Sequence, residues 1–229
     1  MALAATACSH HSARDDAHRV SAAIGDLKSA NLDVVGGADT VTIRGADLGD
    51  DLFQASTPDD SRARPSVVND HGTVTLHLVD ADRPQSTADD RTAGAGPAAL
   101  EVRLSTKVVW RLHLDGGAKV TTIDFGAGRL AGLDLSAGST RIDVVLPSPQ
   151  GTVPVRMAGG ASEFDLRAPA GVPTQVRVGG GAGSVQLDGV SHSGVSGGTM
   201  FTPPDWSSAT DRYDVDATGG VSELTLSRS

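Results

Sequence analysis

Two short glycine motifs are the first candidates for chemistry in this chain. Gly126, Gly128 and Ala131 satisfy the G-x-G-x-x-A pattern of dinucleotide-binding turns, which hold a pyrophosphate at the N-terminus of a helix. The residues that follow read LDLSAGSTRIDVVL (133–146), and their alternation of apolar and polar types predicts a strand. Because the motif lacks a helix to hold the phosphate, we interpret it as a turn between strands.

The second motif has the pattern of a hydrolase nucleophile elbow. Gly194, Ser196 and Gly198 match G-x-S-x-G, and His192 lies nearby. An elbow needs a strand, a sharp turn and then a helix, whereas the following TMFTPPDW (199–206) contains two adjacent prolines, which oppose a helix. The calcium-binding repeat G-G-x-G-x-D also fails at 180–185, because valine occupies the carboxylate position.

The remaining polar and aromatic candidates are expected to be surface or packing groups. Four aspartate doublets lie in polar segments, and adjacent residues of a strand point to opposite faces. These doublets are Asp15-Asp16, Asp50-Asp51, Asp59-Asp60 and Asp89-Asp90. Trp110 and Trp206 are candidates for a carbohydrate-stacking platform, although packing in the core or a cap is the expectation. The sequence therefore predicts no catalytic, cofactor-binding or metal-binding residue, and no cofactor.

Cys8 is the single cysteine, which excludes an internal disulfide. It ends the string LAATAC, which is similar to the end of a bacterial lipoprotein signal, although Leu3 lies five residues before the cysteine instead of three. The seven preceding residues are too few for the charged and apolar regions of a signal. Cys8 is therefore a candidate lipid-attachment site if translation starts further upstream, and otherwise an exposed thiol. No stretch of 18 apolar residues predicts a membrane span.

An internal repeat dominates the rest of the chain. Short alternating runs flank a glycine-containing pair, and the clearest copies start at 112, 133, 155 and 176, which are 21, 22 and 21 residues apart. An early copy starts at 32 and a late one at 215, so one coil is expected to carry an insertion of roughly 18 residues. The predicted corner glycines are Gly36, Gly37, Gly116, Gly117, Gly138, Gly159, Gly160, Gly180, Gly181, Gly219 and Gly220.

These repeats predict an all-β fold. Period-2 alternation indicates strands with one buried face. Two strands joined by a glycine corner and followed by a link such as PSPQGTVP make a coil of about 21–22 residues, and such coils stack into a parallel β-solenoid. A leucine-rich-repeat-like solenoid is the alternative, because LAGLDLSAG (130–138) matches the opening of that repeat.

We expect one domain preceded by a flexible tail. The front of the domain is irregular and caps the stack, and its start is interpreted as either a helix or a capping strand. A polar segment at 80–98 has the composition of an exposed loop. The predicted layout is a tail at 1–19, a β-solenoid at 20–229, its front section at 20–105, and regular coils at 106–229 with an inserted loop at 189–212 packed by Phe201 and Trp206.

The charge balance narrows the range of partners. The net charge of −9 argues against nucleic acid, because phosphate binding depends on clustered lysine and arginine. Only three of the 19 basic residues are lysines, and this bias towards arginine indicates a high-GC bacterial genome. The membrane is expected as a partner only through a lipid anchor at Cys8.

The GGAS corners, the link LPSPQGTV and the closing TGGVSELTL resemble a bacterial, actinobacterial-type family of glycine-rich adhesin domains. The resemblance covers roughly 32–229, with a more distant likeness to the C-terminal domain of LiaF-type envelope-stress proteins. It implies a single-stranded, right-handed β-solenoid on extracytoplasmic proteins of Gram-positive bacteria, and it supplies no catalytic residues to transfer. The chain departs from the simplest members by the segment at 189–212 and by its irregular front.

The expected function is non-enzymatic. We predict an extracytoplasmic, envelope-associated scaffold or adhesin-like binding protein of a high-GC Gram-positive bacterium, with a protein or cell-envelope component as partner. One alternative is an accessory protein for envelope-stress signalling, and a cytoplasmic location is the alternative to the envelope. A carbohydrate-active enzyme on a β-helix is disfavoured, because no cluster of Asp, Arg and Lys gathers on one face in the predicted coils.

Overall fold

A computed structural model describes residues 18–61, 63–80 and 96–229, and within them the fold is all-β, as predicted. No helix occurs in these residues, so the helical half of a leucine-rich-repeat-like solenoid is missing from the part of the chain that the structure describes. At the start of the domain, where the sequence left a helix or a capping strand open, the structure has strands. The strands are β1 (Arg19–Ala23), β2 (Ser29–Val35), β3 (Ala38–Ala46), β4 (Asp51–Ser56), β5 (Ala63–Asp70), β6 (Thr73–Asp80), β7 (Ala99–Ser105), β8 (Val109–Leu114), β9 (Ala118–Asp124), β10 (Arg129–Leu135), β11 (Ser139–Val145), β12 (Thr152–Met157), β13 (Ala161–Ala168), β14 (Thr174–Val178), β15 (Ala182–Leu187), β16 (Val190–Val195), β17 (Thr199–Phe201), β18 (Arg212–Ala217) and β19 (Val221–Arg228).

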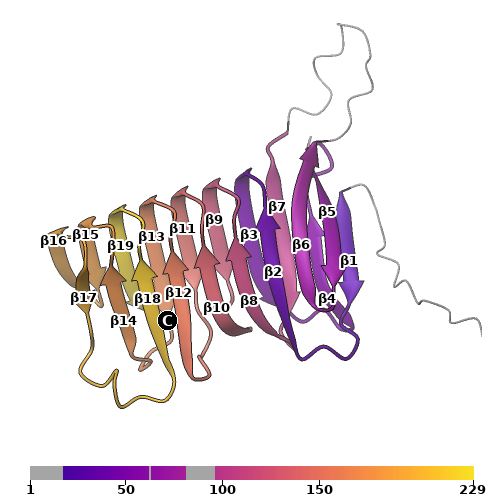
Figure 1. Cartoon of the computed structure of the whole chain (residues 1–229). Coiled ribbons are helices and arrows are strands. Elements are labelled where there is room, and N and C mark those ends of the chain that lie inside the picture. The colour runs from indigo at the N-terminus through magenta and orange to yellow at the C-terminus, as the bar shows by residue number, and fades with distance from the viewer. Residues whose placement is uncertain (1–17, 62, 81–95) are drawn as a thin grey trace, which may run out of the picture.

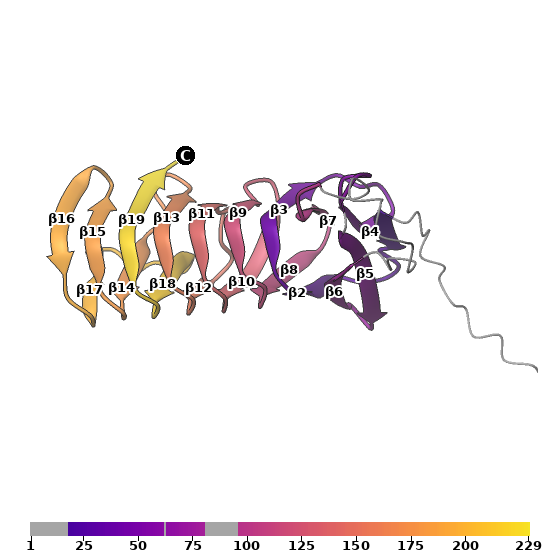
Figure 2. The ribbon, with the colours of Figure 1, turned by 90° about the horizontal axis from the view of Figure 1, so that it is seen from above.

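The strands form two sheets that face each other along an elongated stack (Figures 1 and 2). The ten-stranded sheet has the order β1-β4-β7-β3-β9-β11-β13-β19-β15-β16, and the nine-stranded sheet has the order β17-β14-β18-β12-β10-β8-β2-β6-β5. We call the end with β1 and β5 the front end, and the end with β16 and β17 the distal end.

Seven strand pairs, here called rungs, each pass from the nine-stranded to the ten-stranded sheet. They are β2–β3, β6–β7, β8–β9, β10–β11, β12–β13, β14–β15 and β18–β19. Neighbouring rungs pair in parallel, and this alignment stacks equivalent positions of the repeat above one another. One buried ladder consists of Leu32, Leu112, Leu133, Val155, Val215 and Val176.

The rungs do not stack in chain order. The C-terminal rung β18–β19 lies between β12–β13 and β14–β15, with parallel pairing on both sides in both sheets. Likewise, β2–β3 lies between β6–β7 and β8–β9. The expectation of consecutive coils, one with a long insertion, is therefore wrong at both ends. The closely matching segments 159–164 and 219–224 lie side by side, since β19 is the neighbour of β13.

The ends also depart from the expected parallel stack, because both are closed by antiparallel strands. At the front end β4 pairs with β1 and β7, and β5 pairs with β6. At the distal end β16 pairs with β15, and β17 pairs with β14. The reversals use His71-Gly72 and Asp188-Gly189, all four at positive φ, which is the backbone of tight two-residue hairpins.

The interior between the sheets is one hydrophobic cluster that extends from Val20 to Leu226. It is mainly aliphatic, and its largest buried side chains are Trp110, Tyr213, Phe53, Phe125 and Phe164. Most polar residues of the strands face outwards, with Ser105, Thr121 and Thr174 as buried exceptions, so a binding surface is expected on an outer sheet face, at a strand edge or at an end.

Candidate functional site

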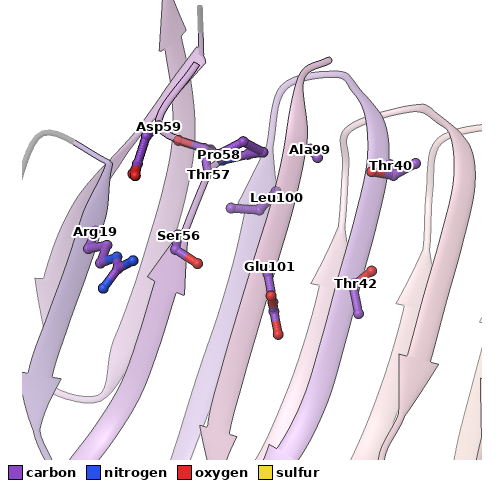
Figure 3. Close-up of a pocket in the computed structure, with 10 residues that line it drawn as sticks. All are labelled: Arg19, Thr40, Thr42, Ser56, Thr57, Pro58, Asp59, Ala99, Leu100 and Glu101. Atoms are coloured by element: carbon purple, nitrogen blue, oxygen red, sulfur yellow. The ribbon is translucent and has the colours of Figure 1, made fainter. Parts of the chain in front are cut away.

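A shallow groove of about 370 Å³ opens on the outer face of the ten-stranded sheet, close to the front end (Figure 3). Four strands contribute to it, namely β1, β4, β7 and β3, together with the residues directly after β4. Its lining consists of Arg19, Thr40, Thr42, Ser56, Thr57, Pro58, Asp59, Ala99, Leu100 and Glu101. The groove is therefore polar over most of its surface and contains no aromatic ring.

Strand register brings the central side chains of the groove together. Arg19 is opposite Ser56, Ser56 is opposite Glu101, and Glu101 is opposite Thr42. Directly opposed residues on one face have Cβ atoms about 4.5–5.5 Å apart. A guanidinium, two hydroxyls and a carboxylate thus line one row across the four strands.

One wall of the groove is fixed by contacts between the segment after β4 and the start of β1. The Thr57 amide donates to the His18 carbonyl at 3.0 Å, and the Thr57 hydroxyl lies 3.0 Å from His18 Nδ1. Thr57 is 5% exposed. The contact between the Thr57 hydroxyl and the His18 imidazole therefore links the end of β4 to the start of β1. It is not placed to act as a nucleophile and base, because burial leaves the hydroxyl little access to a substrate.

The groove offers hydrogen bonds and charge of both signs to a ligand. Arg19 can donate from its planar guanidinium, while exposed Glu101 and Asp59 can only accept when ionised. Threonine and serine hydroxyls can do either. Such a set suits a ligand that carries many hydroxyl groups. In the described ranges, no group of three or more His, Cys, Asp and Glu residues has the placement to hold a metal ion.

The predicted corner glycines all lie at the turns that join the two strands of a rung. At several of them the backbone of the neighbouring rung comes too close for a side chain. A Cβ on Gly116 would collide with Gly36, one on Gly219 with Gly159, and one on Gly180 with Gly219. The contacts follow the spatial order of the rungs. The contribution of these glycines to stability stays a prediction.

The two rejected glycine motifs adopt turns without a following helix. Gly128 donates its amide to the Phe125 carbonyl, and β10 begins at the next residue. The Ser196 carbonyl accepts from both the amide and the hydroxyl of Thr199, between β16 and β17. His192 packs on Phe201 with ring centroids 4.8 Å apart, so it closes the distal end of the core.

Both tryptophans have structural partners. Trp110 is fully buried and donates from Nε1 to the Ser105 carbonyl at 2.9 Å. Trp206 donates from Nε1 to the Tyr213 carbonyl at 3.1 Å, and the guanidinium of Arg212 covers its ring at 4.2 Å. Packing is the observed role of both rings, which leaves them poorly placed as a platform for carbohydrate.

Several sequence predictions fall outside the described residues. These are the candidate lipid-attachment site Cys8, the doublets Asp15-Asp16 and Asp89-Asp90, and most of the predicted exposed loop. Among the described residues, no helix is both long and apolar enough to cross a membrane. The groove itself was missed by the sequence analysis, because its residues come from segments up to 82 positions apart (Arg19 to Glu101) and carry no motif.

Of three comparisons with known proteins, only the one with solved structures finds similarity to this chain. No protein-family model matches it, and no curated protein matches it. The crystal structure of a candidate cell adhesion protein from Clostridium sporogenes is similar, with a TM-score of 0.63 and 13% identity over 92% of this chain and 98% of that one. A candidate adhesin from Bacteroides fragilis is 9% identical over 87% of this chain and 93% of that one, with a TM-score of 0.25. The first likeness establishes a shared fold.

Proposed function

We propose that this protein is a non-enzymatic, adhesin-like binding module of the bacterial cell envelope. The observation that carries the proposal is the shared fold with a protein named for cell adhesion, over almost the whole length of both chains. Its outer sheet faces are polar and extended, as suits a scaffold that presents a binding surface.

The groove near the front end is the proposed recognition site, and its ligand is an oligosaccharide of a cell surface. Arg19, Ser56, Glu101 and Thr42 together supply donors and acceptors in one row. Carboxylates and guanidinium groups can each bind two neighbouring hydroxyls of a sugar. The open form of the groove suits a chain that lies across the strands.

The handedness of the stack and the extent of the domain are also part of the proposal. We infer a right-handed β-solenoid that acts as one domain over 20–229, with the terminal rungs inserted out of chain order. Seven rungs with parallel neighbours support this interpretation. An extracytoplasmic location in a high-GC Gram-positive bacterium, with a lipid anchor at Cys8, is likewise part of the proposal and follows from the sequence pattern.

The test is binding of the purified chain to an array of bacterial envelope oligosaccharides, followed by calorimetry with the strongest ligand. Glu101→Gln should weaken that binding about tenfold or more, since a hydrogen bond to a charged group is worth about 1.5–3 kcal/mol. Glu223→Gln is the matched control, because Glu223 is an exposed glutamate of the same sheet face on β19. Failure of every oligosaccharide to bind, or equal affinity of both variants, would contradict the proposed site.

A further inference from the structure

The two ends of the stack differ in how their edge strands are protected. The distal end is formed by β16 and β17, and the sixteen positions 189–204 contain no Asp, Glu, Lys or Arg. The front end carries Arg19 in β1 and Arg64, Pro65 and Asp70 in β5. Charge and proline on an edge strand are the usual means of preventing it from pairing with another chain. Edge strands β1 and β5 of the front end carry such residues, whereas β16 and β17 contain neither a charged residue nor a proline.

The distal edges also offer free backbone groups. β16 ends the ten-stranded order and β17 ends the nine-stranded order, so each has a partner on one side among the described strands. Their other sides present backbone amides and carbonyls to solvent, which is the template that an added strand uses.

Exposed apolar side chains accompany these edges. Val190 in β16 is 59% exposed and Met200 in β17 is 42% exposed. Phe201 and Val195 are only partly buried where they pack against the end of the core. The two strands β16 and β17 are the last of their sheets at this end, as Figures 1 and 2 show.

We propose that the distal end is a self-association surface, where β16 and β17 of one copy meet the same strands of a second copy. A second copy fits this surface because its own distal end offers the same uncharged edge strands, each with one side unpaired among the described strands. The chain carries a net charge of −9, so two copies repel each other, and the uncharged distal end is the place where they can approach without opposed carboxylates. Identical strands pair antiparallel about a two-fold axis, which closes the assembly as a dimer.

The dimer would place the two front ends at opposite extremes of one longer stack. The groove lies near β1, β4 and β7, at the opposite end of the ten-stranded order from β16, so both grooves stay open. Since the distal edges comprise one strand of six residues and one of three, the interface is small and the association belongs to the weak class.

The test is sedimentation equilibrium of the full chain at concentrations up to about 500 µM, a range that detects weak dimers. Ser193 is exposed on β16, and Ser193→Lys introduces two like charges across the two-fold axis. This variant should raise the dissociation constant about tenfold or more. Ser66→Lys is the matched control, since Ser66 is exposed on the edge strand β5 of the front end. It should dimerise like the parent chain.

Thermal unfolding of both variants checks that each is folded. A parent chain that stays monomeric at every concentration overturns the proposal. This holds even if the distal end is found to pair with a strand of a different protein. A dimer that Ser66→Lys disrupts and Ser193→Lys leaves intact overturns it as well, because the contact would then lie at the front end.

Discussion

Single residues at the corners decide how closely the rungs approach. A Cβ on Gly159 would overlap the backbone of Ala137 and Gly138 in the neighbouring rung, whereas a Cβ on Gly160 would lie 3.3 Å from the Gly220 carbonyl oxygen. Neither glycine has a positive φ. The difference between the two positions is therefore one of space between rungs, and it distinguishes the two glycines of a pair that look equivalent in the sequence.

We expect Gly159→Ala to lower the free energy of unfolding by about 1–3 kcal/mol, because an added methyl in a packed region forces the backbone apart. Gly160→Ala should have a clearly smaller effect, since the Gly220 carbonyl has to move by only a few tenths of an ångström. Urea unfolding of both variants measures the difference. Equal losses would show that the corner tolerates a methyl equally at both positions.

Tyr213 provides a pH-dependent contribution to stability. Its hydroxyl donates to the Pro147 carbonyl at 2.7 Å, and burial raises the pKa of the phenol above its ordinary value. Because the folded state favours the neutral phenol, this contribution is complete below about pH 10 and is lost as the pH rises above that value.

Tyr213→Phe should therefore cost about 1–3 kcal/mol at pH 7, because the buried Pro147 carbonyl loses its donor. Above pH 10 the parent chain should lose stability more steeply than the variant. Urea unfolding at several pH values between about 8 and 11 tests this. Parallel pH profiles would mean that the phenol ionises as easily in the fold as in the unfolded chain.

At the scale of the strand, parallel register places like charges side by side. Asp143 on β11 is opposite Asp165 on β13, and Arg141 binds both, at 2.9 Å and 3.0 Å, as well as Glu163 at 2.5 Å. Asp143 and the other two carboxylates raise the pKa of Arg141 above its usual value. One guanidinium therefore offsets the repulsion among three carboxylates on the outer face.

Removal of this cation with Arg141→Met should lower the thermal midpoint at pH 7 in low salt. The loss should shrink in 1 M salt, where the screening length is about 3 Å. Arg44→Met on β3 is the control, as another exposed arginine of the same sheet. A loss of the same size in low and in high salt would indicate packing by the side-chain stem instead.

At the scale of the whole molecule, both terminal rungs lie inside the stack. The rung β18–β19 separates β14–β15 from β12–β13. Its strands β18 and β19 are the parallel neighbours of β14 and β15. The rung β18–β19 is consequently a structural bridge on which the distal end depends.

A chain truncated after residue 211 should lose amide-exchange protection throughout β14–β17 as well as the deleted rung. In a stack built in chain order, the same deletion would remove one end and leave its neighbours protected. Hydrogen exchange followed by mass spectrometry compares the two outcomes peptide by peptide. Parent-like protection in β14–β17 would show that β14–β15 docks directly on β12–β13.

Sequence periodicity was sufficient for the strands of the regular rungs, because each strand has one face in the core and alternates accordingly. The reversal at Asp188-Gly189 was missed, although this dipeptide is typical of two-residue hairpins, because 189–212 was interpreted as an inserted loop. The groove could not be predicted in this way. Arg19, Ser56 and Glu101 are ordinary exposed residues until pairing places them in one row.

The amino-acid sequence by itself determined that this protein is all-β, that its strands come in repeated pairs, and that glycines join them, because alternation and corner chemistry are local properties. The order of the rungs, the antiparallel ends, the groove and the uncharged distal end were decided by the tertiary structure. All copies of the repeat share the same apolar face, so each could stack on several others. The choice among neighbours depends on contacts between residues far apart in the chain.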